Sequence, residues 1–220
     1  VFSGDGFFYD YPLGRAHYGD LGYMKIARVI YDDIHALKTF GVNGYMSCQE
    51  LRAMSPTGFP DYVMAQALTD ERIPFETLRD TYFSAMFGPG WEEAVAFLER
   101  LSALSDTDYW NNHGPRFQPA LADRYRHITL LAEEFRTRIP LAQKEVWRKN
   151  WEYLDFHCRY TMLLAGALER LSMGDQEEAD RRFENFCDFI RREEPRRQSR
   201  LDVYRVIEVA TKYTGFSMPR

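Results

Sequence analysis

The sequence LADRYRHITLLAEEFRTRI, residues 121–139, decides the fold class, because its apolar residues recur at steps of three and four. That spacing places them on one face of an α-helix. Residues 141–172 repeat the pattern, and Gly174 is a natural end for that second helix. Asp175 followed by Glu178 resembles a capping box that starts a third helix. The apolar face of the first helix consists of Leu121, Tyr125, Ile128, Ala132, Phe135 and Ile139.

The segments on either side of these helices are also helical in pattern. Earlier helices are predicted at about residues 61–68, 74–87 and 91–104. A last helix is predicted to begin at Ser199, after a basic run at residues 191–200 that we interpret as a helix end and a loop rather than a phosphate-binding patch. Amphipathic helices joined by short loops pack antiparallel, so the sequence predicts a helical bundle.

The N-terminal region has a different pattern. Residues 6–11 (GFFYDY) and 42–48 (VNGYMSC) are predicted strands, and residues 21–40 between them are predicted to be a helix. Strand, helix, strand is typical of a parallel sheet or a (β/α) barrel, and two strands are too few for a stable parallel sheet. The chain opens on Val1 rather than Met, and we expect it to be part of a longer protein. We therefore predict a barrel-like segment at 1–58 and a helical domain at 59–220.

Composition excludes several classes of function. A net charge of −5 argues against nucleic acid as a partner. The sequence contains no run of 18 apolar residues, so no membrane span is expected. Cys48, Cys158 and Cys187 are too far apart for a CxxC metal or redox motif. Phosphate-binding glycine loops and serine-hydrolase motifs are absent, so no cofactor is expected. The cellular compartment stays open.

Polar residues at the ends of the two predicted strands form the first candidate site. Barrel enzymes place their working side chains at the C-terminal ends of strands. Asp10 ends the first strand, and Gln49 and Glu50 follow the second, so we expect all three to line one rim. A helix-start or loop role is the alternative for Glu50. A glycosidase needs two carboxylates at a set separation, which the sequence does not supply, so no catalytic pair is assigned.

The segment at residues 109–118 (YWNNHGPRFQ) forms the second candidate site. Sugars bind through aromatic rings against their apolar faces and through amides or arginines on their hydroxyl and carboxylate groups. Trp110, Asn112, His113 and Arg116 fit a sugar or uronate contact. A packed loop that closes the bundle fits equally well.

Asp32, Asp33 and His35 lie close together on a predicted helix, where they form either a metal site or a solvated helix face. Asp32 and His35 share a helix face at a spacing of three, but no second ligand cluster completes the site. We therefore expect no metal.

Three segments together resemble a known family. They are FYDYPLG, ARVIYDDIHALKTFGVNGYMSCQE and PDYVMAQALTDERIPFETLRDTYFSAMFGPGWEEAVAFLERL, within about residues 6–104. This part of the chain is similar to the C-terminal part of large bacterial proteins in domain-of-unknown-function family 4838, which look like glycoside hydrolases with a (β/α) barrel. The residues that carry the likeness are Tyr62, Ala65, Leu68, Tyr82, Phe83, Phe87 and Gly88.

The resemblance implies carbohydrate chemistry without a defined reaction. It also implies that the chain lacks the earlier barrel strands, so we expect the chain alone to be inactive and its missing partner to be the N-terminal barrel of the same protein. The predicted fold is therefore mainly α, a helical bundle after a short α/β segment that looks like the last strands of a barrel. The alternative is a non-catalytic helical module for bracing or oligomerisation.

Overall fold

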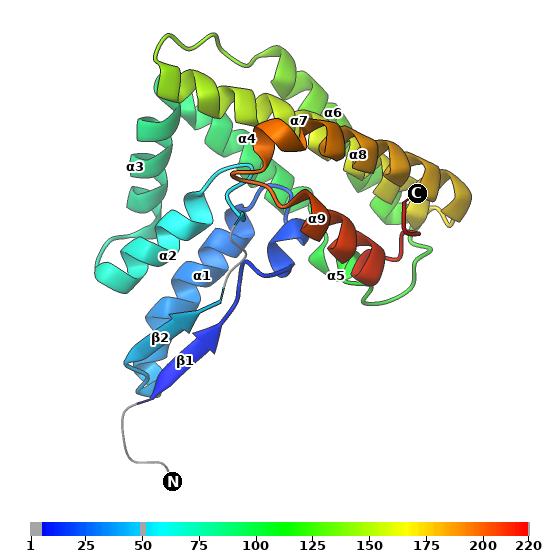
Figure 1. The fold of residues 1–220 in the computed structure, drawn as a ribbon. Coiled ribbons are helices and arrows are strands. Elements are labelled where there is room, and N and C mark those ends of the chain that lie inside the picture. The colour runs from blue at the N-terminus through cyan, green and yellow to red at the C-terminus, as the bar shows by residue number, and fades with distance from the viewer. Residues whose placement is uncertain (1–5, 49–51, 220) are drawn as a thin grey trace.

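The computed structural model describes residues 6–48 and 52–219 and is mainly helical, with a small parallel sheet of two strands (Figure 1). The helical prediction is therefore confirmed. Single turns of other helix types occur at Ala16–Gly19, Lys38–Phe40 and Ala210–Thr214. In chain order the strands and α-helices are β1 (Phe7–Asp10), α1 (Met24–Leu37), β2 (Gly44–Ser47), α2 (Phe59–Thr69), α3 (Phe75–Phe87), α4 (Trp91–Leu104), α5 (Thr107–Trp110), α6 (Pro119–Thr137), α7 (Glu145–Ser172), α8 (Gln176–Arg197) and α9 (Val203–Val209).

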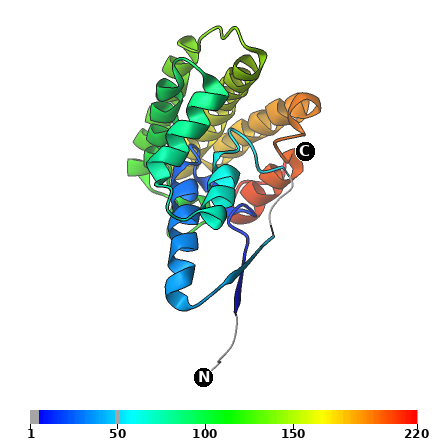
Figure 2. The ribbon, with the colours of Figure 1, turned by 90° about the vertical axis from the view of Figure 1, so that its left-hand side faces the viewer.

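The two strands and α1 form a β–α–β unit at one end of the molecule. Strands β1 and β2 run parallel, with Phe7 opposite Gly44 and Asp10 opposite Ser47. Both strands fall where the sequence predicted them. Helix α1 buries Ile30 and Ile34 in a small apolar cluster that also receives part of Tyr45 from β2. Figure 2 shows the strands beside α1, apart from the long helices.

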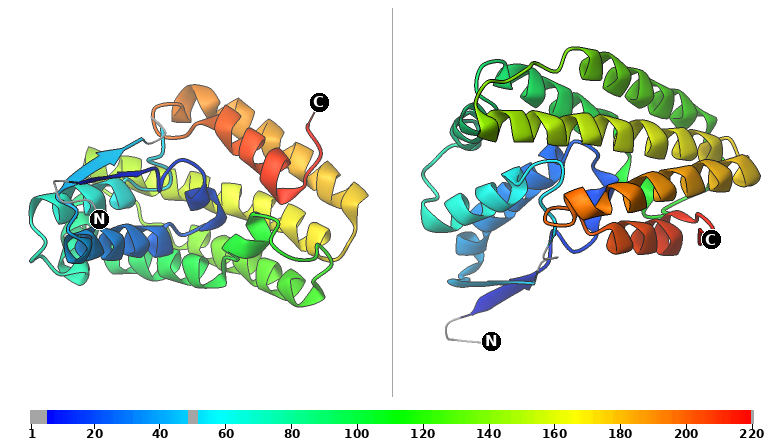
Figure 3. Two further views of the ribbon diagram at one scale, coloured as in Figure 1. Left: turned by 90° about the horizontal axis from the view of Figure 1, so that it is seen from below. Right: turned by 45° about the horizontal axis from the view of Figure 1, so that its top comes forward.

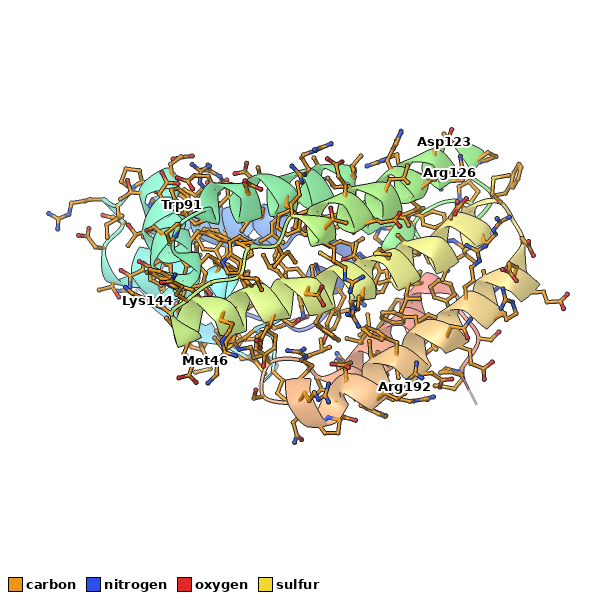
Figure 4. All side chains as sticks on the ribbon, turned by 90° about the horizontal axis from the view of Figure 1, so that it is seen from above. Met46, Trp91, Asp123, Arg126, Lys144 and Arg192 are labelled. Atoms are coloured by element: carbon orange, nitrogen blue, oxygen red, sulfur yellow. The ribbon has the colours of Figure 1, made fainter. Side chains whose placement is uncertain are left out.

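Helices α6, α7 and α8 run antiparallel to their neighbours and form the long side of the bundle (Figures 3 and 4). The predicted face of α6 is buried from Leu121 to Phe135, and Ile139 follows the helix end and is partly buried. Phe135 stacks on Phe97 of α4 at 3.9 Å between ring centroids. The 3.6-residue spacing therefore identified the buried face of α6 correctly.

Side chains of α7 anchor the C-terminal end of α3. The last carbonyl groups of a helix have no partner within the helix, and a buried helix end needs donors from elsewhere. Gly88 ends α3 with a φ of +68°, and a Cβ at Gly88 would lie 2.4 Å from the Trp147 ring. Three side chains in the first turns of α7 donate hydrogen bonds to the last carbonyl groups of α3 and so join the two helices. The three bonds, donor first, are Trp147 Nε1 to Ala85 O (3.0 Å), Asn150 Nδ2 to Met86 O (2.9 Å) and Trp151 Nε1 to Phe87 O (3.0 Å).

The starts of α8 and α9 test two predicted caps. Asp175 accepts the Glu178 backbone N–H at 3.3 Å, so the predicted start of α8 is confirmed. The prediction that the last helix begins at Ser199 was wrong. Asp202 caps α9 by accepting the Arg205 backbone N–H at 3.0 Å.

The basic run at residues 191–200 contains the end of α8 and a turn, as predicted. The helix continues through Pro195 to Arg197. Pro195 is exposed and near the helix end, where solvent replaces the backbone hydrogen bond that a proline removes. Arg196 and Arg197 lie in the last turn, where cations interact favourably with the helix dipole.

The β–α–β unit shares its core with the bundle. Leu21, Met24 and Ala27, at the start of α1, belong to the same buried cluster as Leu98 of α4. Farther along, an antiparallel bridge joins Ala53 to Leu201. The predicted division between residues 58 and 59 stays a prediction.

Candidate functional site

The two strands place their alternate side chains on two very different faces. Successive side chains of a strand point to opposite sides of a sheet. Phe8, Asp10 and Tyr45 share the side toward α1, because Tyr45 packs against the cluster that contains Ile34. Phe7, Tyr9 and Met46 therefore occupy the other side. The C-terminal ends of both strands lie together at Asp10 and Ser47.

Asp10 belongs to a small polar group on the α1 side. Its Oδ1 accepts the Tyr11 backbone N–H at 2.7 Å, and its Oδ2 accepts the Tyr45 hydroxyl at 3.4 Å. Burial, and then the negative charge of Asp10, raises the pKa of Tyr45 to about 12. Burial, and then Asp10 and Asp32, raises the pKa of Asp33 on α1. Asp10, Tyr45 and Asp33 therefore lie close together in the structure, which their spacing in the sequence did not predict.

The opposite face of the sheet is open and aromatic. Parallel sheets are ordinarily covered on both faces, so exposed rings here are unusual. Tyr9 and Tyr11 lie with their ring centroids 6.4 Å apart. A hydrogen bond with Cys48 raises the pKa of Tyr9. These rings form a surface that a ligand with an apolar face can cover. The exposed fractions are 67% for Phe7, 52% for Tyr9, 62% for Tyr11 and 53% for Met46.

Gln49 and Glu50, the other two residues of the predicted rim, lie outside the described residues. Of the predicted rim, the structure therefore describes Asp10 alone. Its carboxylate lies on the α1 side of the strand and not on the open face.

Trp110 lies in the core. Only 2% of it is exposed, and its ring contacts the segment before α1 so closely that a Cβ at Gly19 would lie 3.0 Å from Trp110 Cδ1. The segment begins with the helical turn α5, which Asp106 caps by accepting the Tyr109 backbone N–H. In this arrangement the Trp110 ring does not present a face to a ligand.

The other three residues of the second candidate site divide into two kinds. The Arg116 guanidinium lies over the Tyr109 ring and donates to the Tyr109 carbonyl at 2.6 Å and to the Thr214 carbonyl at 3.0 Å. Arg116 therefore ties α5 to the C-terminal segment. Asn112, with a φ of +61°, and His113 are exposed. Of the four residues, these two are the exposed ones.

Asp32, Asp33 and His35 do not converge on a metal position. Both ring nitrogens of His35 lie 2.7 Å from carbonyl oxygens, those of Tyr31 and Glu71. Both nitrogens of the ring are therefore occupied by backbone contacts, and neither is left to bind a metal. In residues 6–48 and 52–219 no group of three or more His, Cys, Asp and Glu side chains is placed to hold a metal ion.

A buried polar cluster near the start of α1 contains an acid and two histidines with perturbed pKa values. Asp20 accepts the Ser102 hydroxyl and the Ile26 backbone N–H, and burial raises the pKa of Asp20. Burial lowers the pKa of His157, whose Nε2 donates to the Leu21 carbonyl, to about 4. Burial likewise lowers the pKa of His17 to about 3. Perturbed groups of this kind often mark active sites. Here Asp20 accepts backbone N–H groups at the start of α1, and all three side chains are buried, so we assign them a structural role.

Comparison with protein-family models, with characterised proteins and with solved structures finds no match to the chain. None of the helices in the described part of the chain has the length and apolar character needed to cross a bilayer.

Sequence reasoning missed the open aromatic face. The alternation within GFFYDY contained the signal, because Phe7, Tyr9 and Tyr11 occupy every second position. The sequence did not show that this face would lack a covering helix. That fact depends on the position of α1 on the other side of the strands.

Proposed function

We propose that this chain is the C-terminal portion of a carbohydrate-active, glycoside-hydrolase-like protein, with β1–α1–β2 as the last part of a (β/α) barrel. The observation that carries the proposal is the open face with Phe7, Tyr9 and Tyr11 exposed. Aromatic rings pack against the apolar faces of sugars, and a parallel sheet is ordinarily covered on both faces, so this face offers surface to a ligand or to another part of the protein. The resemblance of residues 6–104 to family 4838 supports the same conclusion.

The free edges of the sheet support the barrel part of this proposal. Two parallel strands leave backbone donors and acceptors unpaired on both edges. In our proposal, strands of an N-terminal barrel of the same protein pair with these edges. Phe7 then faces the packed barrel interior, while Tyr9 and Tyr11, toward and past the carboxyl end of β1, lie at the barrel mouth, where barrel enzymes bind their substrates. Asp10 then lies at the rim, where it orients Tyr45, and the reacting carboxylates come from other strands.

The experiment is thermal unfolding against a panel of neutral sugars, uronic acids and oligosaccharides. A ligand at a hundred times its Kd stabilises the fold by about 2.7 kcal/mol, which raises the Tm of a chain this size by roughly 5–10 °C. The shift should disappear in Tyr9→Ala and persist in Tyr204→Ala, whose side chain is also exposed but lies on α9. Loss of the shift in both variants, or in neither, would remove the open face from the proposal.

A second candidate function is a non-catalytic module that braces a barrel. It is favoured by the ties that fix the β–α–β unit to the helices, above all the buried contacts of Asp20 and His157 at the start of α1. In that case no sugar in the panel raises the Tm. Light scattering would then test whether the chain forms a stable dimer.

A further inference from the structure

Two neighbouring rings on the open face, those of Tyr9 and Tyr11, are inclined to one another. Their ring centroids are 6.4 Å apart, and the angle between the ring planes is 60°. More than half of each side chain is exposed. A ligand that packs against both rings therefore meets two flat surfaces that face different directions.

Backbone contacts hold Tyr11 in position. Its N–H donates to Asp10 Oδ1 at 2.7 Å, and its carbonyl accepts the Gly14 backbone N–H at 3.0 Å. The Gly14 carbonyl accepts from Arg205 at 3.3 Å, where the chain that leaves β1 passes beside α9 (Figure 1). A Cβ at Gly14 would lie 3.4 Å from Tyr11 Cδ2, so the ring rests against this turn.

Tyr9 is held at both ends of its side chain. Its backbone lies in the β1–β2 sheet, opposite Met46. Its hydroxyl group is hydrogen-bonded to the side chain of Cys48, whose own backbone N–H donates to the Asp10 carbonyl at 2.9 Å. These contacts fix the direction of the side chain. The inclination between the two rings is therefore a property of the fold rather than of two freely rotating side chains.

The inclination of the rings selects among the shapes of sugar chains. A pyranose unit packs with its apolar face parallel to an aromatic ring, so adjacent units that cover both rings have inclined planes. A β-1,4-linked glucose chain is a flat ribbon whose units are nearly coplanar, and it can pack against one of the two rings at a time. An α-1,4-linked chain curves, and each unit is turned relative to the one before it. The geometry of the rings therefore favours a curved chain.

The charges near the rings favour a neutral ligand. The Asp10 carboxylate accepts from the Tyr11 N–H and the Tyr45 hydroxyl, and no lysine or arginine pairs with it among the described side chains. Arg205, which reaches the turn after Tyr11, is paired with Glu208 at 2.6 Å. A uronate on these rings would meet the negative charge of Asp10 without gaining an ion pair.

We propose that Tyr9 and Tyr11 bind two successive units of a neutral, curved oligosaccharide of the α-1,4-linked glucose type. One unit covers the Tyr9 ring and the next unit covers the Tyr11 ring. This inference rests on the proposed function, because it names the class of sugar that the same open face takes.

The test compares two glucose hexasaccharides that differ only in linkage, maltohexaose (α-1,4) and cellohexaose (β-1,4), by isothermal titration calorimetry. Maltohexaose should bind about fivefold more tightly, the effect of one further ring contact. Tyr11→Ala should remove this preference by weakening maltohexaose about fivefold, with cellohexaose changed by less than about twofold. Trigalacturonic acid, which is α-1,4-linked but charged, should bind more weakly than maltotriose.

Two further variants serve as controls. Tyr11→Phe keeps the ring and should keep the preference for maltohexaose. Tyr204→Ala removes an exposed ring on α9 and should leave both affinities unchanged. The Tm of each variant checks that it is folded, and the comparison of the two hexasaccharides on the wild-type chain does not depend on any variant.

Failure of this inference is distinguishable from failure of the proposed function. Equal or tighter binding of cellohexaose, or a preference for maltohexaose that persists in Tyr11→Ala, would overturn the curved chain while the face remains a sugar site. Tighter binding of trigalacturonic acid than of maltotriose would overturn the neutral ligand. If none of these sugars binds, the proposed function fails and this inference fails with it.

Discussion

Replacement of Trp110 by alanine should destabilise the protein whether or not a sugar is present. The ring is 2% exposed, and the void beside it measures only about 10 Å³, so truncation leaves a cavity the size of an indole. Truncation of a buried tryptophan costs about 3–5 kcal/mol. That is a large share of a typical total of about 5–15 kcal/mol, and it lowers the Tm by roughly 6–20 °C.

Urea unfolding followed by circular dichroism measures this loss. Trp110→Phe should cost only about 1–2 kcal/mol, because the indole N–H has no hydrogen-bond partner in the described part of the chain and its removal breaks no bond. His113→Ala, at an exposed neighbouring position, should change stability by less than about 0.5 kcal/mol. If Trp110→Ala unfolds like the wild type but loses affinity for a sugar, the ring is a ligand platform and our placement of it is refuted.

Three further predictions follow from single contacts. Gly88→Ala should destabilise by more than about 1 kcal/mol in urea unfolding, because its φ is +68° and a Cβ would meet the Trp147 ring; wild-type stability would show that this end of α3 adjusts freely. Asp175→Ala should cost about 1 kcal/mol through loss of the bond to the Glu178 N–H, and an unchanged midpoint would contradict the cap. The pKa of His157 is about 4 in the folded state against 6.5 in the unfolded state, so the folded state binds fewer protons. The contribution of the neutral His157 ring to the free energy of unfolding is therefore complete above pH 6.5. It is lost as the pH falls toward 4, by up to about 3 kcal/mol. Urea titrations across this pH range should show a shallower dependence in His157→Gln, and equal slopes in both proteins would exclude His157 as the cause.

The helices and both strands could be predicted because their signals are local. The apolar spacing from Leu121 to Phe135 and the capping pair at Asp175 depend on residues within a few positions of one another. The same locality explains the error at Ser199. Serine is a statistical signal for a helix cap, and the structure uses Asp202 instead.

The candidate site was less accessible to prediction, because its contacts are long-range. Trp110 is a plausible sugar platform by composition, and only its packing against Gly19 shows that the ring is buried. The approach of Tyr45 to Asp10 joins residues 35 positions apart. The exposure of Tyr9 depends on the side of the sheet that α1 covers, which the strand pattern leaves undecided.

The most direct test of the central claim is NMR mapping of backbone amides while the oligosaccharide panel is added. We predict shift changes at Phe7–Tyr11 and Gly44–Cys48, on the strands that carry the open aromatic face, with the amides of α6–α8 unmoved. If no sugar perturbs these strands, or if the changes gather on the long helices instead, the open face is not a carbohydrate site and the proposed function is contradicted.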